Sequence, residues 1–345
     1  MSDNERFAAL RLLRTAGVGP VSWRQLLMRF GTARAAADAL PDLAARGGRR
    51  LTLADPRGVA AEMERVAALG ARHIFQNDYD YPALLAESEG APAAIIVRGD
   101  IALAQCPALA MVGARNASAI ACRFARQIAA ELAADGITIV SGLARGIDIA
   151  FPPENAALQD EIGGVHLLIA EQPPGSQPLA RHFPARNRII AGLALGTLVV
   201  EAAPKSGSLI TARRAAEFGR EVMAVPGSPL DPRAQGCNLL IREGATLVQS
   251  AADVREMLRP IDARMVREPG RGWPDDSGMS TADAEAEAND GDRARITGLL
   301  SPVAVPVDEL VRQSGCPPSV VSLVLLELEL AGRLERHAGG RVSGG

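Results

Sequence analysis

The chain has 345 residues and a formal net charge of −3; 48% of its residues are hydrophobic and 22% are charged. This length exceeds one ordinary core and predicts two or three domains. The small net charge excludes binding through a uniformly basic surface, so any anion site must be local. Apolar runs such as LVLLELEL are short and interrupted by charge, and none predicts a membrane span.

The cysteines and histidines indicate neither a metal site nor a disulfide framework. Four cysteines lie far apart without a C-x-x-C pair, and the four histidines stand alone. The N-terminus, MSDNERFAALRLLR, has acidic residues before an amphipathic run and no signal-peptide core. We therefore expect reduced thiols, no cofactor and a cytoplasmic protein.

Residues 1–92 predict a helical N-terminal domain. The amphipathic stretch ERFAALRLLRTA is followed by the turn Gly17–Pro20 and then by VSWRQLLMRFG. A Gly-x-Gly-Pro turn between short helices resembles a helix-hairpin-helix, whose backbone N–H groups can contact a DNA phosphate. Because there is one hairpin with few basic residues beside it, a plain helical turn is the favoured interpretation.

Residues 93–258 predict an α/β domain with a doubly wound, Rossmann-like parallel sheet. Short apolar runs, which we expect to be strands, alternate with helical stretches that have capping residues. The expected strands are ALAMVGAR, ITIVSGLARG, VHLLIAE, GTLVVEAA and EVMAVPG. The last segment of this domain, NLLIREGATLVQSAADVREML, has enough apolar positions to form a sheet edge or a dimer surface.

Residues 259–292 predict a disordered acidic linker. From Met265 to Asp292 there are two arginines and eight acidic residues, without apolar periodicity. Residues 293–345 then predict three helices and a two-stranded ribbon, which is the layout of a winged helix. Its third helix, SVVSLVLLELELAG, is apolar and acidic, so we expect protein contact or stabilisation rather than DNA recognition from this helix.

The segments around the carboxyl ends of the expected strands combine glycine with arginine or lysine. Ligands of open parallel sheets bind at this edge, and glycine-rich turns and helix N-termini suit phosphate. Lys205, in one of these segments, is the only lysine of the chain. The candidate phosphate-binding residues are Gly113, Arg115, Ser141, Gly142, Arg145, Arg186, Asn187, Arg188, Lys205, Ser206, Gly207 and Ser208.

Known enzyme motifs match poorly. GARNAS lacks the later glycines of G-x-G-x-x-G, no Walker A sequence occurs, and Ser141 has neither a G-x-S-x-G context nor a placed histidine. The stretch GTLVVE, ending at Glu201, resembles the Gly-Thr-x-x-Glu of nucleotide phosphoribohydrolases of the LOG or lysine-decarboxylase-like family. There the glutamate acts near a ribose, but GLAL replaces the preceding double glycine. The other interpretation of Glu201 is a strand-end carboxylate that pairs with an arginine.

Several stretches of the chain together carry a further resemblance. They are RTAGVGP, MVGARNAS, VSGLARGID, FPPEN, HFPARNRIIAG, TLVVEA, KSGSLITARRA and GREVMAVPGSPLDPRAQGCNLLIREGATLV. These stretches resemble the DprA/Smf family, the DNA-processing proteins of natural transformation. The resemblance implies an extended Rossmann fold that binds single-stranded DNA, dimerises through the sheet domain, loads RecA recombinase and has no catalytic activity. In the family, basic residues at the positions of Arg115 and Lys205 contact DNA.

One departure from the family concerns the junction of Ala150 and Phe151. The family continues with a helix and a strand before its Pro-Pro-Glu-Asn stretch, whereas Ala150 here runs directly into FPPEN. About two dozen residues are missing, most of the ~30 that a βαβ unit needs. We expect an omitted segment, and Cα atoms much further apart than about 3.8 Å would indicate it.

Several alternatives stay open at this stage. Arg145, Arg186 and Arg188 could instead form structural ion pairs with Glu171, Glu201 or Asp148. Aromatic residues make up 3% of the chain, so we expect little base stacking, and we expect Phe151 and Phe183 to be core residues. The rival functions are a LOG-type nucleotide hydrolase and a protein-binding scaffold.

Overall fold

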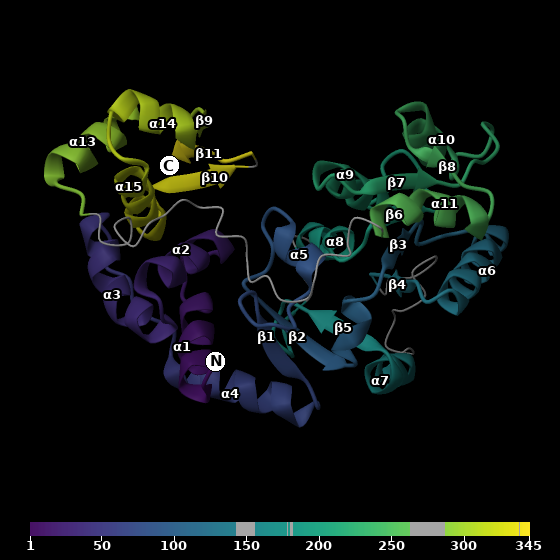
Figure 1. Cartoon of the computed structure of the whole chain (residues 1–345), viewed down its shortest axis with the longest axis horizontal. Helices are drawn as coiled ribbons and strands as arrows, with labels where there is room; N and C mark the ends of the chain where they lie inside the picture. Colours follow the sequence, from purple (N-terminus) through teal and green to yellow (C-terminus); the bar gives the residue numbers. More distant parts are fainter. Residues whose placement is uncertain (143–155, 178, 180–181, 263–286, 338) are drawn as a thin grey trace. The chain divides into compact units, whose positions relative to one another are not determined.

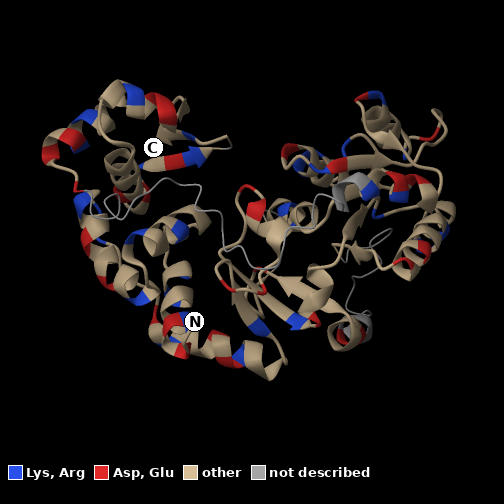
Figure 2. Cartoon of the chain, in the orientation of Figure 1, with Lys and Arg blue, Asp and Glu red and all other residues tan. Residues whose placement is uncertain are grey.

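The computed structural model describes residues 1–142, 156–177, 179, 182–262, 287–337 and 339–345 (Figure 1). The chain divides into two compact units. Unit 1 comprises residues 1–64 and 270–345, and unit 2 comprises residues 65–269. In both units, charged side chains lie mainly on helices and loops, and the strands of the largest sheet are mostly uncharged (Figure 2).

Unit 1 begins with the helices α1 (Asp3–Leu13), α2 (Pro20–Phe30) and α3 (Ala33–Arg46), and α4 (Pro56–Ala68) follows. Trp23 of α2 is buried and its Nε1 donates to the Ala9 carbonyl of α1 at 3.0 Å. In the turn before α2, the N–H of Val18 donates to Thr15 O at 3.1 Å and that of Gly19 to Ser22 Oγ at 2.8 Å. These two N–H groups stabilise the turn itself, which favours a structural role for the hairpin.

The C-terminal part of unit 1 has the predicted winged-helix layout. It contains α13 (Asp290–Leu299), β9 (Val305–Pro306), α14 (Val307–Ser314), α15 (Pro318–Leu330), β10 (Leu334–His337) and β11 (Arg341–Gly344), with sheet order β10-β11-β9. Nine of the 13 residues of α15 are buried because this helix packs against α2 and α3. A Cβ on Gly47 would lie 2.1 Å from the Glu327 carbonyl oxygen, so glycine allows this close backbone approach.

Unit 2 contains two sheets. The five-stranded sheet has the order β4-β3-β6-β7-β8, and all of its pairs are parallel. Its strands are β3 (Ala108–Val112), β4 (Thr138–Val140), β6 (Gly196–Val199), β7 (Glu221–Ala224) and β8 (Thr246–Leu247). The second sheet joins β1 (Arg72–Phe75), β2 (Ala94–Gly99) and β5 (Leu167–Ala170) in antiparallel order β1-β2-β5.

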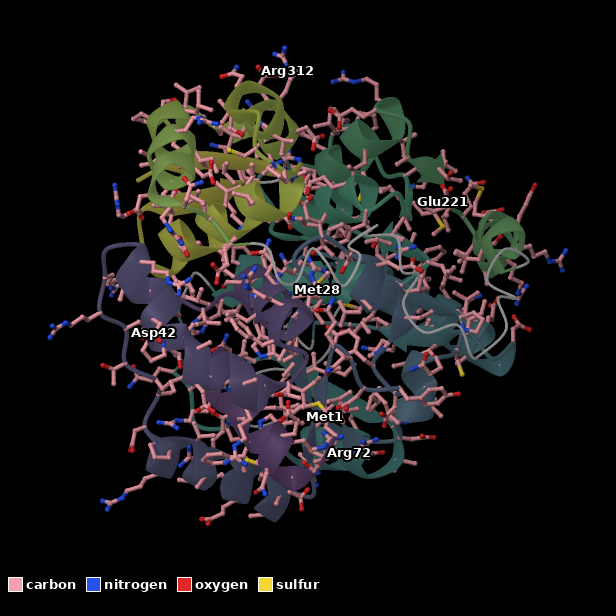
Figure 3. The ribbon with its side chains drawn as sticks, turned by 60° about the vertical axis from the view of Figure 1, so that its left-hand side comes forward. Met1, Met28, Asp42, Arg72, Glu221 and Arg312 are labelled. Carbon is pink, nitrogen blue, oxygen red and sulfur yellow. The ribbon has the colours of Figure 1, made fainter. Side chains whose placement is uncertain are left out.

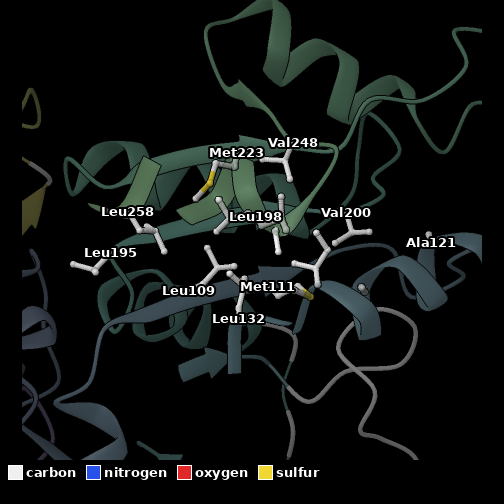
Figure 4. Close-up of a cluster of buried hydrophobic side chains, with 14 of the residues drawn as sticks. Leu109, Met111, Ala121, Leu132, Leu195, Leu198, Val200, Met223, Val248 and Leu258 are labelled. Carbon is white, nitrogen blue, oxygen red and sulfur yellow. The ribbon is translucent and has the colours of Figure 1, made fainter. Parts of the chain in front are cut away.

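The helices of unit 2 are α5 (Ala83–Glu87), the 3₁₀ helix η1 (Ile101–Ala104), α6 (Ala119–Ala134), α7 (Ala156–Val165), α8 (His182–Gly192), α9 (Ser208–Glu217), α10 (Gln235–Arg242) and α11 (Ala251–Asp262). Strand periodicity explains how they cover both faces of the parallel sheet. Leu109 and Leu198 pack towards α6 and α11 (Figure 4), whereas Ala110 and Val199 pack with residues of α8 and α9. The strands are therefore apolar throughout, as parallel strands buried on both faces must be.

The parallel sheet confirms the predicted fold class, but two expectations were wrong in detail. Residues 72–75 form β1, although helices were expected up to residue 92. The segment VHLLIAE forms β5 as predicted, yet β5 pairs antiparallel with β2 instead of joining the parallel sheet. A four-residue apolar run shows that a strand exists but not its direction, which depends on the edge available to it. The expected break between 150 and 151 lies outside the described residues.

Leu198→Ala tests the position of the core. Leu198 is fully buried between the sheet and α6 with α11, so its truncation should lower the free energy of unfolding by about 2–5 kcal/mol. Ile120→Ala is the control because Ile120 is 72% exposed on α6, and its effect should stay within about 0.5 kcal/mol. Urea unfolding followed by circular dichroism measures both values, and equal effects would contradict the assigned core.

Candidate nucleic-acid interface

The candidate residues meet at the carboxyl edge of the parallel sheet. Beyond β3 and β6, the N–H of Ala114 donates to the Glu201 carbonyl at 2.7 Å, so these two loops lie side by side. Beyond β4, a Cβ on Gly142 would lie 2.8 Å from Nη2 of Arg186, which places this strand end against α8. The Nδ2 of Asn187 donates to the Gly207 carbonyl at 3.5 Å. Four segments that are distant in sequence thus form one surface.

Phe183 is the centre of this surface. The guanidinium carbon of Arg115 lies 5.1 Å from the centroid of its ring, and that of Arg186 lies 5.6 Å away. Both distances are within the range of cation–π attraction. The ring is 38% exposed, so the expectation that Phe183 is a core residue was wrong. Two guanidinium groups from different segments therefore lie against one exposed aromatic side chain.

Glu201 fixes the loop that carries Arg115. Its carboxylate accepts the N–H of Ser118 at 3.0 Å and the hydroxyl of Ser118 at 2.7 Å. Ser118 also begins α6, since its Oγ accepts the N–H of Ala121 at 3.1 Å. Glu201 is 8% exposed, and these donors compensate for the burial of its charge. Among the described residues, the hydrogen-bond partner of its carboxylate is therefore this serine, and no arginine pairs with it there.

The only lysine lies in the turn between β6 and α9. The side chain of Lys205 is exposed and makes no hydrogen bond or ion pair within the described part of the chain. Ser206 Oγ lies 2.6 Å from Ser208 Oγ and accepts the N–H of Ser208 at 3.4 Å. Ser208 is the first residue of α9 and is buried, so Ser206 supplies the acceptor at the start of this helix.

The remaining candidates separate into four groups. Arg188 forms an ion pair with Glu171, which is the structural alternative considered for it. Ser141 and Gly142 lie at the end of β4, and Gly142 packs against α8. Arg145 lies outside the described residues. Gly113 directly follows β3 and begins the loop that carries Arg115.

The described residues at this edge offer neither a reactive thiol nor a metal site. Burial raises the pKa of the nearby Cys237 thiol to about 11, so this thiol stays protonated near neutral pH and is a poor nucleophile. Within the described residues, no three His, Cys, Asp or Glu side chains form a group that could hold a metal ion. A search of the same residues for a membrane-spanning helix finds none of sufficient length and hydrophobicity.

The sequence identified the loops and an aromatic residue close to them, but it indicated neither the exposure of Phe183 nor the Glu201–Ser118 contact. The signal for Phe183 was its place in HFPARN, directly before two candidate arginines. The signal for Ser118 was its position as a helix-capping residue at the end of GARNAS. Neither signal indicates that Phe183 lies against Arg115 or that Ser118 binds Glu201, because these residues are far apart in the sequence and only the fold brings them together.

Three family models match the chain. The model described as DNA recombination-mediator protein A matches residues 72–151 and 147–259, and the two matches meet where the sequence analysis expects a missing segment. A DprA-like N-terminal HHH domain matches residues 3–65, and a DprA winged helix domain matches residues 280–340.

Curated proteins resemble the chain over most of their length. The DNA processing protein DprA of Streptococcus pneumoniae is 41% identical over 231 residues, which are 57% of this chain and 82% of the relative. Protein Smf of Escherichia coli is 36% identical over 301 residues, which are 78% of this chain and 77% of the relative.

Two solved structures resemble the fold. The X-ray structure of DprA from Streptococcus pneumoniae has a TM-score of 0.63 and 33% identity, and the match covers 74% of this chain and 98% of that one. DNA processing protein A from Helicobacter pylori, studied for its single-stranded DNA binding mode, has a TM-score of 0.51 and 23% identity, with 55% and 96% covered. The second likeness concerns the fold alone. With the three family models and the curated relatives, the chain belongs to the DprA/Smf family of DNA recombination-mediator proteins.

Proposed function

We propose that the carboxyl edge of the parallel sheet binds single-stranded DNA. The observation that carries the proposal is the exposed ring of Phe183 with Arg115 and Arg186 against it. Guanidinium groups attract backbone phosphates, and an exposed ring offers a surface on which an unpaired base can stack. A duplex keeps its bases stacked on one another, so only a single strand can use both features.

Lys205 and the turn that follows it extend this surface. Its exposed ammonium is a flexible point charge at the carboxyl end of a strand, beside the N-terminus of α9. Both features favour a phosphate group. Ser206 and Gly207 shape the turn, and the contact of Asn187 with Gly207 joins it to α8. A strand could therefore contact Lys205 and the Phe183 ring at the same time.

The cellular role that we propose rests on the resemblance to the family. We propose that the bound strand is passed to RecA recombinase and that the chain acts in the cytoplasm during DNA processing in transformation. The relatives named DNA processing protein support this role. Filament assembly by RecA on a single strand, measured with and without the chain, tests the transfer; an unchanged assembly rate would remove this part of the proposal.

The proposal assigns no catalytic step to this surface. The rival LOG-type hydrolase needs Glu201 near a ribose, but both carboxylate oxygens of Glu201 already accept hydrogen bonds from Ser118. If the chain released free base from a nucleoside monophosphate, the LOG-type hydrolase would be the better proposal.

We further propose that two copies associate through β8 and α10. β8 is the last strand in the sheet order and exposes 43% of Leu247. An exposed strand edge with an apolar side chain is a surface that pairs readily with another chain. The dimer implied by the family resemblance fits this edge.

Arg115→Ala and Lys205→Ala should each weaken single-strand binding across sequences. Each variant removes one phosphate contact, so the slope of log affinity against log salt should fall by about one. Lys205→Arg should keep part of the affinity because the charge remains. Fluorescence anisotropy with labelled oligonucleotides over a salt series measures these changes.

Arg126→Ala is the matched control, since Arg126 is an exposed arginine within α6. It should leave the affinity and the salt slope unchanged. If Arg115→Ala and Lys205→Ala behave like this control, the sheet edge is not the DNA site.

Phe183→Ala should reduce affinity for a single strand by about 1–3 kcal/mol, the contribution of one stacked base. Phe183→Tyr should retain most of the affinity because it keeps the ring. Binding to a duplex of the same sequence should change little with either variant. An equal loss for both forms of DNA, or an equal loss for Ala and Tyr, would show that Phe183 does not stack on a base.

Leu247→Glu should convert the proposed dimer into a monomer, because it places a charge at the paired edge. Ile120→Glu is the control at another exposed apolar residue of unit 2. Light scattering of the full chain gives the mass of each variant. A monomeric mass for the unchanged chain would disprove the dimer.

A further inference from the structure

A second basic surface lies within unit 1, where α3 ends against the winged helix. Arg46 is the last residue of α3, and Arg49 follows in the next turn. Arg333 lies between α15 and β10, and its Nη1 donates to the Gly47 carbonyl at 3.4 Å. A terminal nitrogen of Arg49 approaches Gly332, 3.1 Å from the position that a Cβ would take there. The three arginines thus surround one contact between two parts of the sequence. We call them the junction arginines.

A surface cavity of about 370 Å³ opens at this contact. The residues around it include Arg46, Arg293, Glu327, Arg333 and the apolar Val324 and Leu328. Three guanidinium groups and one carboxylate therefore face the same space. Because the cavity is built from α3, α13 and α15, neither the N-terminal helices nor the winged helix could form it alone.

The positive charges of this cavity exceed the negative ones. Glu327, buried in α15, is neutralised by Arg293, whose Nε and Nη2 donate to it at 2.8 and 3.0 Å. The junction arginines form no ion pair with an acidic residue anywhere in the described part of the chain. Asp42 lies one turn before Arg46 on α3 (Figure 3), and the two side chains are not bridged. The three junction arginines are therefore exposed and without an ion-pair partner among the described residues, whereas Arg293 also pairs with Asp290 at 3.5 Å.

The neighbouring arginines of α2 are partly buried, and burial is the main cause of their lowered pKa. For Arg29, the carboxylates of Glu327 and Glu287 oppose the change in pKa, and the positive charge of Arg46 adds to it. The exposed side chains of the junction arginines therefore supply the positive charge that favours the approach of an anion.

We propose that the junction arginines bind the phosphate backbone of duplex DNA. No aromatic residue is among those that line the cavity, so this surface offers nothing on which an unpaired base could stack. A duplex carries the denser array of phosphates, about one charge per 1.7 Å of helix axis. This proposal does not depend on single-strand binding at the sheet edge, which uses different residues in the other unit.

The competing explanation is purely structural. Basic side chains near a helix C-terminus stabilise its free carbonyl groups, and the contact between Arg333 and Gly47 is of this kind. A structural role predicts loss of thermal stability without loss of DNA binding. A binding role predicts that changing Arg49 lowers DNA binding without lowering thermal stability. The side chain of Arg49 is exposed and has no acidic partner among the described residues.

The test uses the full chain with Arg46, Arg49 and Arg333 changed together to glutamine. A labelled blunt duplex of about two helical turns is the probe. Its affinity at low salt should fall about tenfold or more, and the slope of log affinity against log salt should fall by about two to three. The triple change to lysine should restore most of the binding, because a phosphate is attracted by either charge. Single-strand binding by the glutamine variant should change much less.

Arg34, Arg57 and Arg65 changed together to glutamine form the matched control, because they are exposed and do not line the cavity. Unchanged duplex binding in the junction variant, or an equal loss in the control, overturns the proposal. So does competition for the junction by ATP at micromolar concentration, since that would indicate a mononucleotide pocket. A variant that combines Arg115→Ala with Lys205→Ala should leave duplex binding intact. This variant therefore tests the junction proposal independently of the single-strand proposal for the sheet edge.

Discussion

Unit 2 depends on one constraint, the parallel alignment of the five central strands. Strands that run in the same direction bring all of their carboxyl ends to one edge, and the connecting segments must start there. The ladder continues past β3 and β6, where the N–H of Val200 donates to the Val112 carbonyl at 3.0 Å and that of Ala114 to Glu201 at 2.7 Å. The loop of Arg115 and the segment that leads to Lys205 are thus placed by backbone hydrogen bonds, before any side chain contributes.

Glu201 then gives this edge its precision. A buried carboxylate is unfavourable unless donors replace its lost water, and Ser118 supplies two of them. The same serine begins α6, so one interaction connects the end of β6, the loop after β3 and the start of a helix. Arg115 lies in the middle of that loop. The carboxylate that most resembles a catalytic residue in the sequence therefore serves to position an arginine.

The sequence predicted the features that depend on local pattern, namely the strands and the loops after them. It did not predict the features that depend on contacts between distant residues, namely the exposure of Phe183 and the direction of β5. Apolar runs ending in glycine identified the central strands and the loops of Arg115 and Lys205. The same kind of evidence placed Phe183 in the core, because hydrophobic type is a property of the residue, whereas exposure depends on its neighbours. Those neighbours are Arg186, one turn away on α8, and Arg115, from a distant loop. The direction of β5 failed similarly, since the edge of β2 decided it.

The two basic surfaces differ in one chemical respect, which decides what each can distinguish. Coulomb attraction between guanidinium groups and phosphates acts on any nucleic acid and weakens with salt. The ring of Phe183 adds an interaction that requires an unstacked base, so the sheet edge can discriminate by strand type. The junction of α3 with the winged helix has charge without a ring, so only the density of phosphates can favour one ligand over another. A net charge of −3 is therefore compatible with the two proposed nucleic-acid surfaces, because each depends on a local cluster of basic side chains rather than on total charge.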